Sequence, residues 1–338
     1  MKRETYRSIV KASGIEKGDL VLIQNWMEDT ISEDVGYLQA EIAAVGATPI
    51  LMIQNLKISQ LVNENITDTT YGDKYFRLFE AADVVIDLME RPIGILLNPL
   101  EPEKMDLLRA YMRKLFQVCS SRKKMLQLRV PTATMAKEEG MDAEEYRNRM
   151  EVAMAIDYSL LKDARVKLKK EVENYQGVTL VTGNGEHRLE LSFEGREWDM
   201  DAGDGDLPCG EICIAPVECK TNGTVYFETI YLPDSEVRGK KQKFENVILT
   251  VENGVITSTN QEELTALLME GEEANRVVCE FGIGMNPNVT SLCGCALLDE
   301  KMMGTFHLGI GDNVMFGGEN EADDHEDLIG KGDFIWKK

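Results

Sequence analysis

Histidine and acidic residues occur together in the C-terminal part of the chain, in segments rich in glycine. Only three histidines are present, and two of them lie near the C-terminus, His307 in GTFHLGIGDN and His325 in DDHED. Two glutamates precede them, Glu211 in LPCGEICIAP and Glu280 in CEFGIGMNP. Imidazole and carboxylate groups are ligands of divalent metals such as Zn, Mn, Co and Fe. The pattern therefore predicts a metal site in this region.

The surroundings of each residue support that prediction. Glu280 stands in an otherwise apolar segment, where a lone buried carboxylate is costly unless it is paired or bound to a cation. Glu211 follows a Pro-x-Gly turn, which suits either an exposed position at a strand edge or a ligand directed into a cleft. His325 and Asp327 are two residues apart, so in an extended segment both point to the same side and can bind one metal.

Glu211, Glu280, His307, His325 and Asp327 make five candidate ligands, which is more than one tetrahedral zinc ion needs. Five mixed oxygen and nitrogen ligands fit two metals that share a bridging carboxylate, an arrangement that activates water. Two further residues are left open. Glu300, in LLDEKMMG, is either a carboxylate that handles a proton or a surface acid, and His187, in GNGEHR, is predicted to be solvent-exposed.

Five segments, in their order and relative placement, resemble the metallo-aminopeptidases of the aminopeptidase T and aminopeptidase S type. The segments are PCGEICIAP, EFGIGMNP, LLDEKMMGTFHLGIGDN, FGG and HED, and the resemblance is strongest over 178–330. It implies two divalent metal ions per chain (Zn, Co or Mn), with Glu211 as a terminal ligand, Glu280 as the bridge, and His307, His325 and Asp327 completing the set. It also implies an α/β N-terminal domain, an α+β metal-binding domain, and a homodimer that encloses a large cavity.

The function expected from this resemblance is a metal-dependent aminopeptidase that acts on short peptides. Glu211 and Glu280 are the catalytic candidates, and Glu211 is either a base or a ligand. One feature departs from the family, which has a tyrosine shortly after the first histidine. Val314 and its neighbours supply none, and the last tyrosine in the chain is Tyr231. Two alternatives therefore stay open, a diverged non-catalytic member of the fold and a mononuclear-iron, ring-cleaving dioxygenase that uses His325, Asp327 and a further ligand.

Composition and charge exclude several other classes. The 338 residues carry a net charge of −22, which argues against nucleic acid and anionic membranes as partners. The acidity indicates either a well-solvated surface or acids gathered in one cavity. No run of 18 apolar residues and no export signal occur, so a cytoplasmic location is expected. The seven cysteines are expected to be buried free thiols. GNGEH, GIGMN and GIGDN do not match a nucleotide-binding motif and are predicted to be ordinary turns, so no organic cofactor is expected.

The first half of the chain has the pattern of an α/β domain with a parallel sheet. The segment 34–46 has helical periodicity and ends at Gly46. Short apolar runs that predict buried strands occur at 19–24, 47–53, 81–89 and 93–97. Strands that alternate with helices in this way indicate a parallel sheet covered by helices.

Connecting helices are predicted at the end of the first domain, at 103–118 and over 137–173, separated by Pro131. The rest of the chain has the pattern of an α+β domain. After about residue 175 the segments are short and alternating, with glycine and asparagine between them, as in antiparallel β structure. A helix is predicted at 261–274. We therefore expect two domains, an α/β domain at 1–174 and an α+β metal-binding domain at 175–338.

Overall fold

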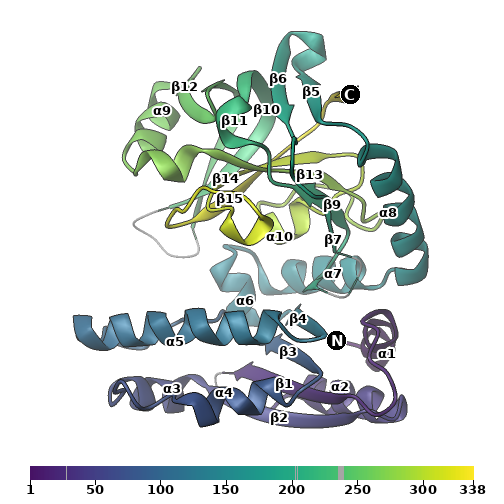
Figure 1. The fold of residues 1–338 in the computed structure, drawn as a ribbon, viewed down its shortest axis with the longest axis vertical. Helices are drawn as coiled ribbons and strands as arrows, with labels where there is room; N and C mark the ends of the chain where they lie inside the picture. The colour runs from purple at the N-terminus through teal and green to yellow at the C-terminus, as the bar shows by residue number, and fades with distance from the viewer. Residues whose placement is uncertain (28, 202, 204, 235–239) are drawn as a thin grey trace. The chain divides into compact units, whose positions relative to one another are not determined.

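The computed structural model describes residues 1–338 except 28, 202, 204 and 235–239, and it forms two compact units (Figure 1). The first unit contains 1–158 and 203–208, and the second contains 159–202 and 209–338. The change of sequence pattern near residue 175 coincides with the passage from the last helix of the central region to the first strand of the second unit. In the described part of the chain, no helix combines the length and the apolar character needed to cross a membrane.

The first unit has a parallel sheet with the strand order β2-β1-β3-β4-β8. β3 is buried at every position, as expected for a parallel strand that is covered on both faces. The strands are β1 (Leu20–Met27), β2 (Thr48–Asn55), β3 (Val84–Met89), β4 (Lys124–Arg129) and β8 (Asp206–Leu207). The helices of this unit are α1 (Arg3–Ala12), α2 (Glu33–Ala44), α3 (Leu56–Asn63), α4 (Asp73–Glu80), α5 (Pro102–Ser120), α6 (Ala133–Glu138) and α7 (Ala143–Met154).

Most of the elements predicted in this unit are confirmed, including the strands at 19–24, 47–53 and 81–89 and the helices at 34–46 and 103–118. The strand predicted at 93–97 is wrong, because these residues form a turn. Pro92 precedes the segment, and Gly94 has a φ of +81°, a left-handed conformation that a strand does not contain. The fourth parallel strand is β4 instead. The helical region at 137–173 is also divided, since Gly140 separates α6 from α7 and Asp142 caps α7.

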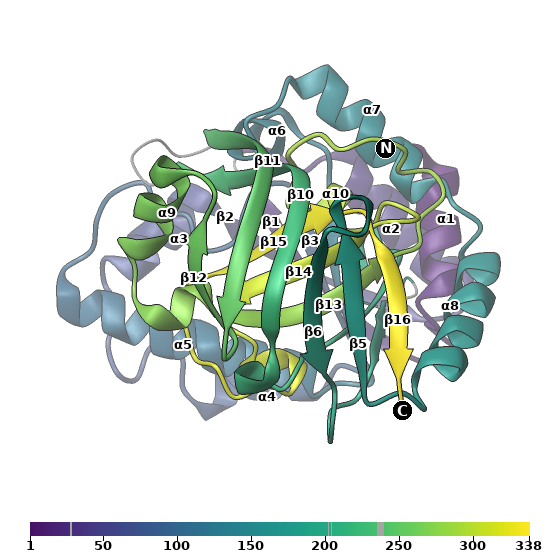
Figure 2. The same ribbon diagram turned by 90° about the horizontal axis from the view of Figure 1, so that it is seen from above.

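The second unit contains two antiparallel sheets, which lie face to face (Figure 2). The first has the order β12-β11-β10-β6-β5-β16 and the second β15-β14-β13-β9-β7. The first sheet consists of β5 (Gly177–Thr182), β6 (His187–Ser192), β10 (Asn222–Pro233), β11 (Lys241–Glu252), β12 (Val255–Thr259) and β16 (Asp333–Lys337). The second consists of β7 (Asp199–Asp201), β9 (Glu211–Ile214), β13 (Val278–Gly284), β14 (Phe306–Gly311) and β15 (His325–Gly330). Three helices accompany them, α8 (Tyr158–Val172), α9 (Glu262–Met269) and α10 (Ala296–Asp299).

The main core of the second unit lies between its two sheets. Val225 and Phe227 of β10 belong to the same buried cluster as Phe281 of β13 and Phe306 of β14. The rings of Phe227 and Phe306 have their centroids 5.6 Å apart, which joins the two sheets directly. An α/β unit with a parallel sheet, followed by a unit of antiparallel sheets and a few helices, confirms the predicted fold class.

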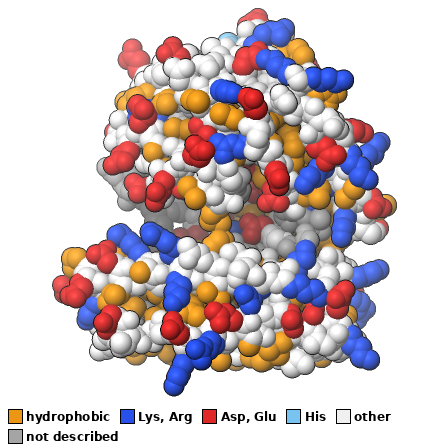
Figure 3. All heavy atoms as spheres, viewed as in Figure 1, with side chains coloured by type: hydrophobic (Ala, Val, Ile, Leu, Met, Phe, Trp, Pro, Cys, Tyr) orange, Lys and Arg blue, Asp and Glu red, His pale blue; other side chains and the backbone are white. Residues whose placement is uncertain are grey.

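The surface charge agrees with the sequence-based interpretation, and the cysteines agree with it in part. On the face shown in Figure 3, acidic and basic side chains are interspersed, as on a well-solvated surface. All seven cysteines are free thiols, and five of them are buried. Cys219 is exposed and Cys293 is half-buried, so the predicted burial is wrong for these two residues.

Candidate metal centre

Strand alternation directs every predicted ligand to the same face of the second sheet. Phe281 and Ile283 of β13 enter the core, so Glu280 and Gly282 face the opposite side. The same alternation applies on β14, where Phe306 and Leu308 enter the core and His307, between them, faces the opposite side. It applies on β15, which places Leu328 in the core, and on β9, which places Ile212 there. One face of this sheet therefore stabilises the fold, and the other is free to carry chemistry.

A glycine lies opposite each of the five predicted ligands in the sheet. The Cα partners are Glu211 with Gly284, His307 with Gly282, Glu280 with Gly309, Asp327 with Gly309, and His325 with Gly311. In an antiparallel pair, the residues that lie opposite each other share the same space above the sheet. Because the glycines carry no side chain, that space is available to the imidazole and carboxylate groups.

Two of these glycines show how tightly the space is used. A Cβ atom on Gly282 would lie 1.9 Å from Nε2 of His307, and one on Gly309 would lie 2.8 Å from Cε1 of His325. The prediction that GIGMN and GIGDN are ordinary turns is therefore wrong. Their glycines lie in β13 and β14, where they let side chains of neighbouring strands lie across the backbone. The GNGEH segment does form a turn, with a short 3₁₀ helix at Gly183–Gly185.

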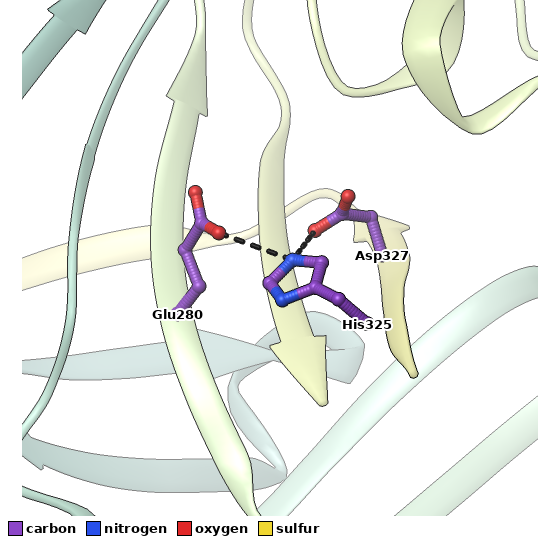
Figure 4. A group of neighbouring side chains, drawn as sticks. All are labelled: Glu280, His325 and Asp327. Carbon is purple, nitrogen blue, oxygen red and sulfur yellow. Dashed lines mark ion pairs between the residues drawn. The ribbon is translucent and has the colours of Figure 1, made fainter. Parts of the chain in front are cut away.

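The five side chains form one continuous series of contacts. Nε2 of His307 lies 3.4 Å from Oε2 of Glu211 and 3.5 Å from Oε1 of Glu280. Nε2 of His325 lies 3.2 Å from Oε2 of Glu280 and 3.5 Å from Oδ1 of Asp327 (Figure 4). Glu280 therefore lies between the two histidines, with a different oxygen directed at each. One ligand atom from each of Glu280, His325 and Asp327 lies within 4.8 Å of the others, a separation that one metal ion can span.

These spacings fit metal coordination better than hydrogen bonding. Hydrogen bonds between nitrogen and oxygen measure about 2.7–3.2 Å, and three of the four distances are longer. Ligand atoms that share a tetrahedral zinc ion at about 2.0–2.2 Å lie about 3.3–3.6 Å from one another. Oε2 of Glu211 and Oδ1 of Asp327 are buried and have no hydrogen-bond partner among the described residues. A divalent cation would satisfy both oxygens, so the residues fit the group that their chemistry predicts.

The two histidines differ in what supports their second ring nitrogen. Nδ1 of His325 lies 2.7 Å from the carbonyl oxygen of Asp312, which accepts a hydrogen bond and leaves Nε2 as the ligand atom. Sγ of Cys279 lies 3.5 Å from the same Nδ1. Nδ1 of His307 is buried, and it has no hydrogen-bond partner in the part of the chain that the structure describes.

Burial and mutual contact shift the pKa of each group. Burial by itself would raise the pKa of Glu280, but contacts with His307 and His325 lower that pKa to about 2. Burial opposes protonation of His307, yet Glu280, Glu211 and Asp327 raise its pKa to about 9. Burial by itself would lower the pKa of His325 and raise the pKa of Asp327. The contact between the two groups outweighs burial, so the pKa of His325 is raised and the pKa of Asp327 is lowered. Protons on the imidazoles thus balance the carboxylates, and a bound cation would replace those protons.

Two further charged residues belong to the site, and the sequence pointed clearly to neither. The side chain of Glu300 is only 12% exposed, so the interpretation of Glu300 as a surface acid is wrong. Burial raises the pKa of Glu300 well above its usual range, and the nearby carboxylates of Glu211 and Asp327 add to this effect. Lys301 is 1% exposed and forms ion pairs with both Glu211 and Glu300. A lysine between an acid and two methionines carries no local signal of burial, which is why sequence analysis missed it.

The remaining residues that the sequence singled out lie apart from this cluster of contacts. His187 is half-buried rather than exposed, because its ring stacks on Tyr226 and its Nδ1 lies 3.2 Å from Oγ1 of Thr224. Val314 is exposed. Tyr231 of β10, the last tyrosine, lines a small cavity that Asp327 also lines. The chain therefore has a tyrosine in a cavity beside the site, although it comes from another strand.

Comparisons with known proteins agree with the fold and identify the family. The sequence profile of a family described as thermophilic metalloproteases (M29) matches residues 9–332. The solved structure of wild-type AmpT from Thermus thermophilus is similar, with a TM-score of 0.63 and 16% identity over 99% of this chain and 96% of that one. A 2,5-dihydroxypyridine dioxygenase from Pseudomonas putida KT2440 is also similar, with a TM-score of 0.60 and 14% identity over 98% of this chain and 92% of that one. No curated protein sequence matches the chain.

Proposed function

We propose that this chain, which belongs to the M29 family of thermophilic metalloproteases, is an aminopeptidase that removes N-terminal residues from short peptides. The family match confirms the predicted relationship and makes the protein a metallopeptidase that depends on divalent metal. The aminopeptidase activity, the number of metal ions and the identity of those ions are our proposal. The observation that carries it is the series of five ligand side chains, with Glu280 directed at both histidines.

Two ions per chain, zinc, cobalt or manganese, suit this arrangement best. Glu211, His307 and one oxygen of Glu280 would hold one ion. The other oxygen of Glu280, with His325 and Asp327, would hold the second. When bound, such ions lower the pKa of a water molecule toward neutrality and polarise a peptide carbonyl.

The side chains around these ligands supply the other requirements of peptide hydrolysis. Glu300 is buried next to Glu211 and Asp327, and its raised pKa lets it hold a proton that a departing amine needs. Glu211, the other carboxylate candidate, is paired with Lys301 and is better suited as a ligand than as a base. The free α-amine of a peptide, in its neutral form, would bind at one of the two ions.

A small cavity lies beside Asp327, next to the proposed metal centre. Tyr231, Ile230 and Leu292 supply apolar surface to it. Lys241 and Glu326 also line the cavity and add charge at its wall. We propose that the N-terminal side chain of a substrate contacts this wall, so that its size and polarity affect the rate of cleavage. A cytoplasmic location and a homodimer remain proposals that follow from the sequence analysis.

The test uses pairs of peptides that differ only at the N-terminus. Protein loaded with Zn²⁺, Co²⁺ or Mn²⁺ is expected to release the first residue from dipeptides and tripeptides with a free amine, as measured by chromatography. The N-acetylated forms of the same peptides should remain intact, because they lack the free α-amine. Chelation should abolish the release, and added metal should restore it. Failure of every metal-loaded form to cleave any free-amine peptide would contradict the proposal.

A second candidate function needs only one ion at the centre. His325 and Asp327, with His307 as the further ligand, would give the set of two histidines and one carboxylate that holds mononuclear iron with open positions. A ring-cleaving dioxygenase is the activity that such a site would support. Anaerobic loading with Fe²⁺, followed by oxygen uptake with aromatic diols, distinguishes it from the peptidase, which consumes no oxygen.

A further inference from the structure

We propose that Lys301 is a permanent cation of the metal centre that makes its two halves unequal. The half formed by Glu280, His325 and Asp327 would bind the first divalent ion tightly. The half formed by Glu211 and His307 would bind the second ion weakly, because the Lys301 ammonium already occupies one side of Glu211. This inference rests on the proposed metal centre, but it does not depend on the peptide substrate.

Lys301 is buried as deeply as any residue of the site. It is 1% exposed, and its Nζ lies 2.7 Å from Oε1 of Glu300. The same Nζ is in close contact with Oε1 of Glu211. A buried charge of this kind is tolerated only when it is paired, so the carboxylate of Glu211 holds the ammonium in place, with Oε1 of Glu300 as a second acceptor. The ammonium is therefore part of the site and does not belong to the surface.

The backbone fixes Lys301 at this position. The carbonyl oxygen of Lys301 accepts a hydrogen bond of 2.8 Å from the Asn286 amide, and the Met303 amide donates back to the carbonyl oxygen of Asn286 at 3.2 Å. Gly284, the strand partner of Glu211, allows this approach, because a Cβ on it would lie 2.1 Å from the Met302 carbonyl oxygen. The absence of a side chain at Gly284 therefore leaves the room that Lys301 needs to reach Glu211.

The consequence for metal binding is electrostatic. Oε1 of Glu211 contacts the ammonium, while Oε2 faces His307 and is the atom left for a metal. A divalent ion on Oε2 would share one carboxylate with a positive charge, and two cations at such short range repel each other. The ammonium also neutralises ligand charge, which lowers the affinity of a carboxylate site for a cation.

The other half has better support from its surroundings. The second ring nitrogen of His325 is hydrogen-bonded to the Asp312 carbonyl oxygen, which orients the ring for coordination. The corresponding nitrogen of His307 has no hydrogen-bond partner among the described residues. Both the charge of Lys301 and the support of the histidine rings therefore favour the Glu280, His325 and Asp327 half.

The decisive experiment titrates metal-free protein with Zn²⁺ in competition with a chromophoric chelator. Wild-type protein should bind one ion tightly and a second ion at least about tenfold more weakly. Lys301→Met keeps the apolar stem and removes the charge. It should tighten the second ion by about 10- to 100-fold and leave the first unchanged. Lys301→Arg keeps the charge and should keep the two affinities unequal. Lys331→Met, at an exposed lysine of the same unit, should match the wild type.

Equal affinities for both ions in the wild type would overturn the inference, and so would a Lys301→Met protein whose second ion binds as weakly as before. If Lys301→Met fails to fold, Lys301→Gln decides in its place, because its amide can still donate to Glu211 but carries no charge. The result also stands apart from the proposed activity. A protein whose second ion binds more tightly after Lys301→Met, but which cleaves no peptide, would contradict the aminopeptidase proposal and leave the role of Lys301 supported.

Discussion

Glu280→Gln is expected to remove metal from both halves of the centre and to reduce peptide cleavage to background. Glu280 directs one oxygen at His307 and the other at His325, so a neutral amide in its place removes an oxygen ligand on one side and the negative charge on both. Changes to residues that merely support metal ligands cost about 10- to 100-fold in metal affinity. The loss of a shared ligand should therefore exceed that range, as measured by elemental analysis after dialysis and by release of N-terminal residues.

Glu252→Gln is the matched control for this substitution, because Glu252 is an exposed glutamate on β11 of the same unit. That variant should retain the metal content and activity of the wild type. Circular dichroism should show both variants folded, which assigns any loss to the site. If Glu280→Gln retained two ions per chain, the shared position of Glu280 between the metals would be ruled out.

Gly282→Ala is expected to disable the site through a single methyl group. The new Cβ would lie 1.9 Å from Nε2 of His307, the atom that faces Glu211 and Glu280. Real Cβ atoms do not approach other atoms so closely, so the imidazole must move away from its ligand position. Overpacking of this kind costs about 1–3 kcal/mol of stability. The metal content of the half that contains His307 should fall, and peptide cleavage should fall with it.

Gly36→Ala provides the comparison for the glycine substitution. Gly36 lies in α2, and a Cβ there meets no atom within 4 Å. Alanine in a helix is favoured over glycine by about 1 kcal/mol, so this variant should be as stable as the wild type or more stable, with full activity. Were Gly282→Ala to bind metal and cleave peptides as well as Gly36→Ala, the proposed packing of His307 against β13 would be wrong.

Local sequence patterns were sufficient for much of the fold. The apolar runs of β1, β2 and β3 and the helical periodicity of α2 and α5 are properties of neighbouring residues, and each was predicted within a few positions. Where the pattern failed, a backbone conformation was responsible. IGILL at 93–97 has the composition of a strand, but the left-handed Gly94 turns the chain, and the less apolar KMLQLR forms β4.

The same distinction applies to the metal centre. The sequence by itself determined which residue types can bind metal and that His325 and Asp327 share one side, because alternation in a strand is a local property. Only the tertiary structure decided that β9, β13, β14 and β15 pair in the register that places a glycine opposite each ligand. It also decided that Lys301 is buried against Glu211, 90 residues earlier in the chain. Strand register and the pairing of buried charges depend on contacts between distant segments, and no local pattern encodes them.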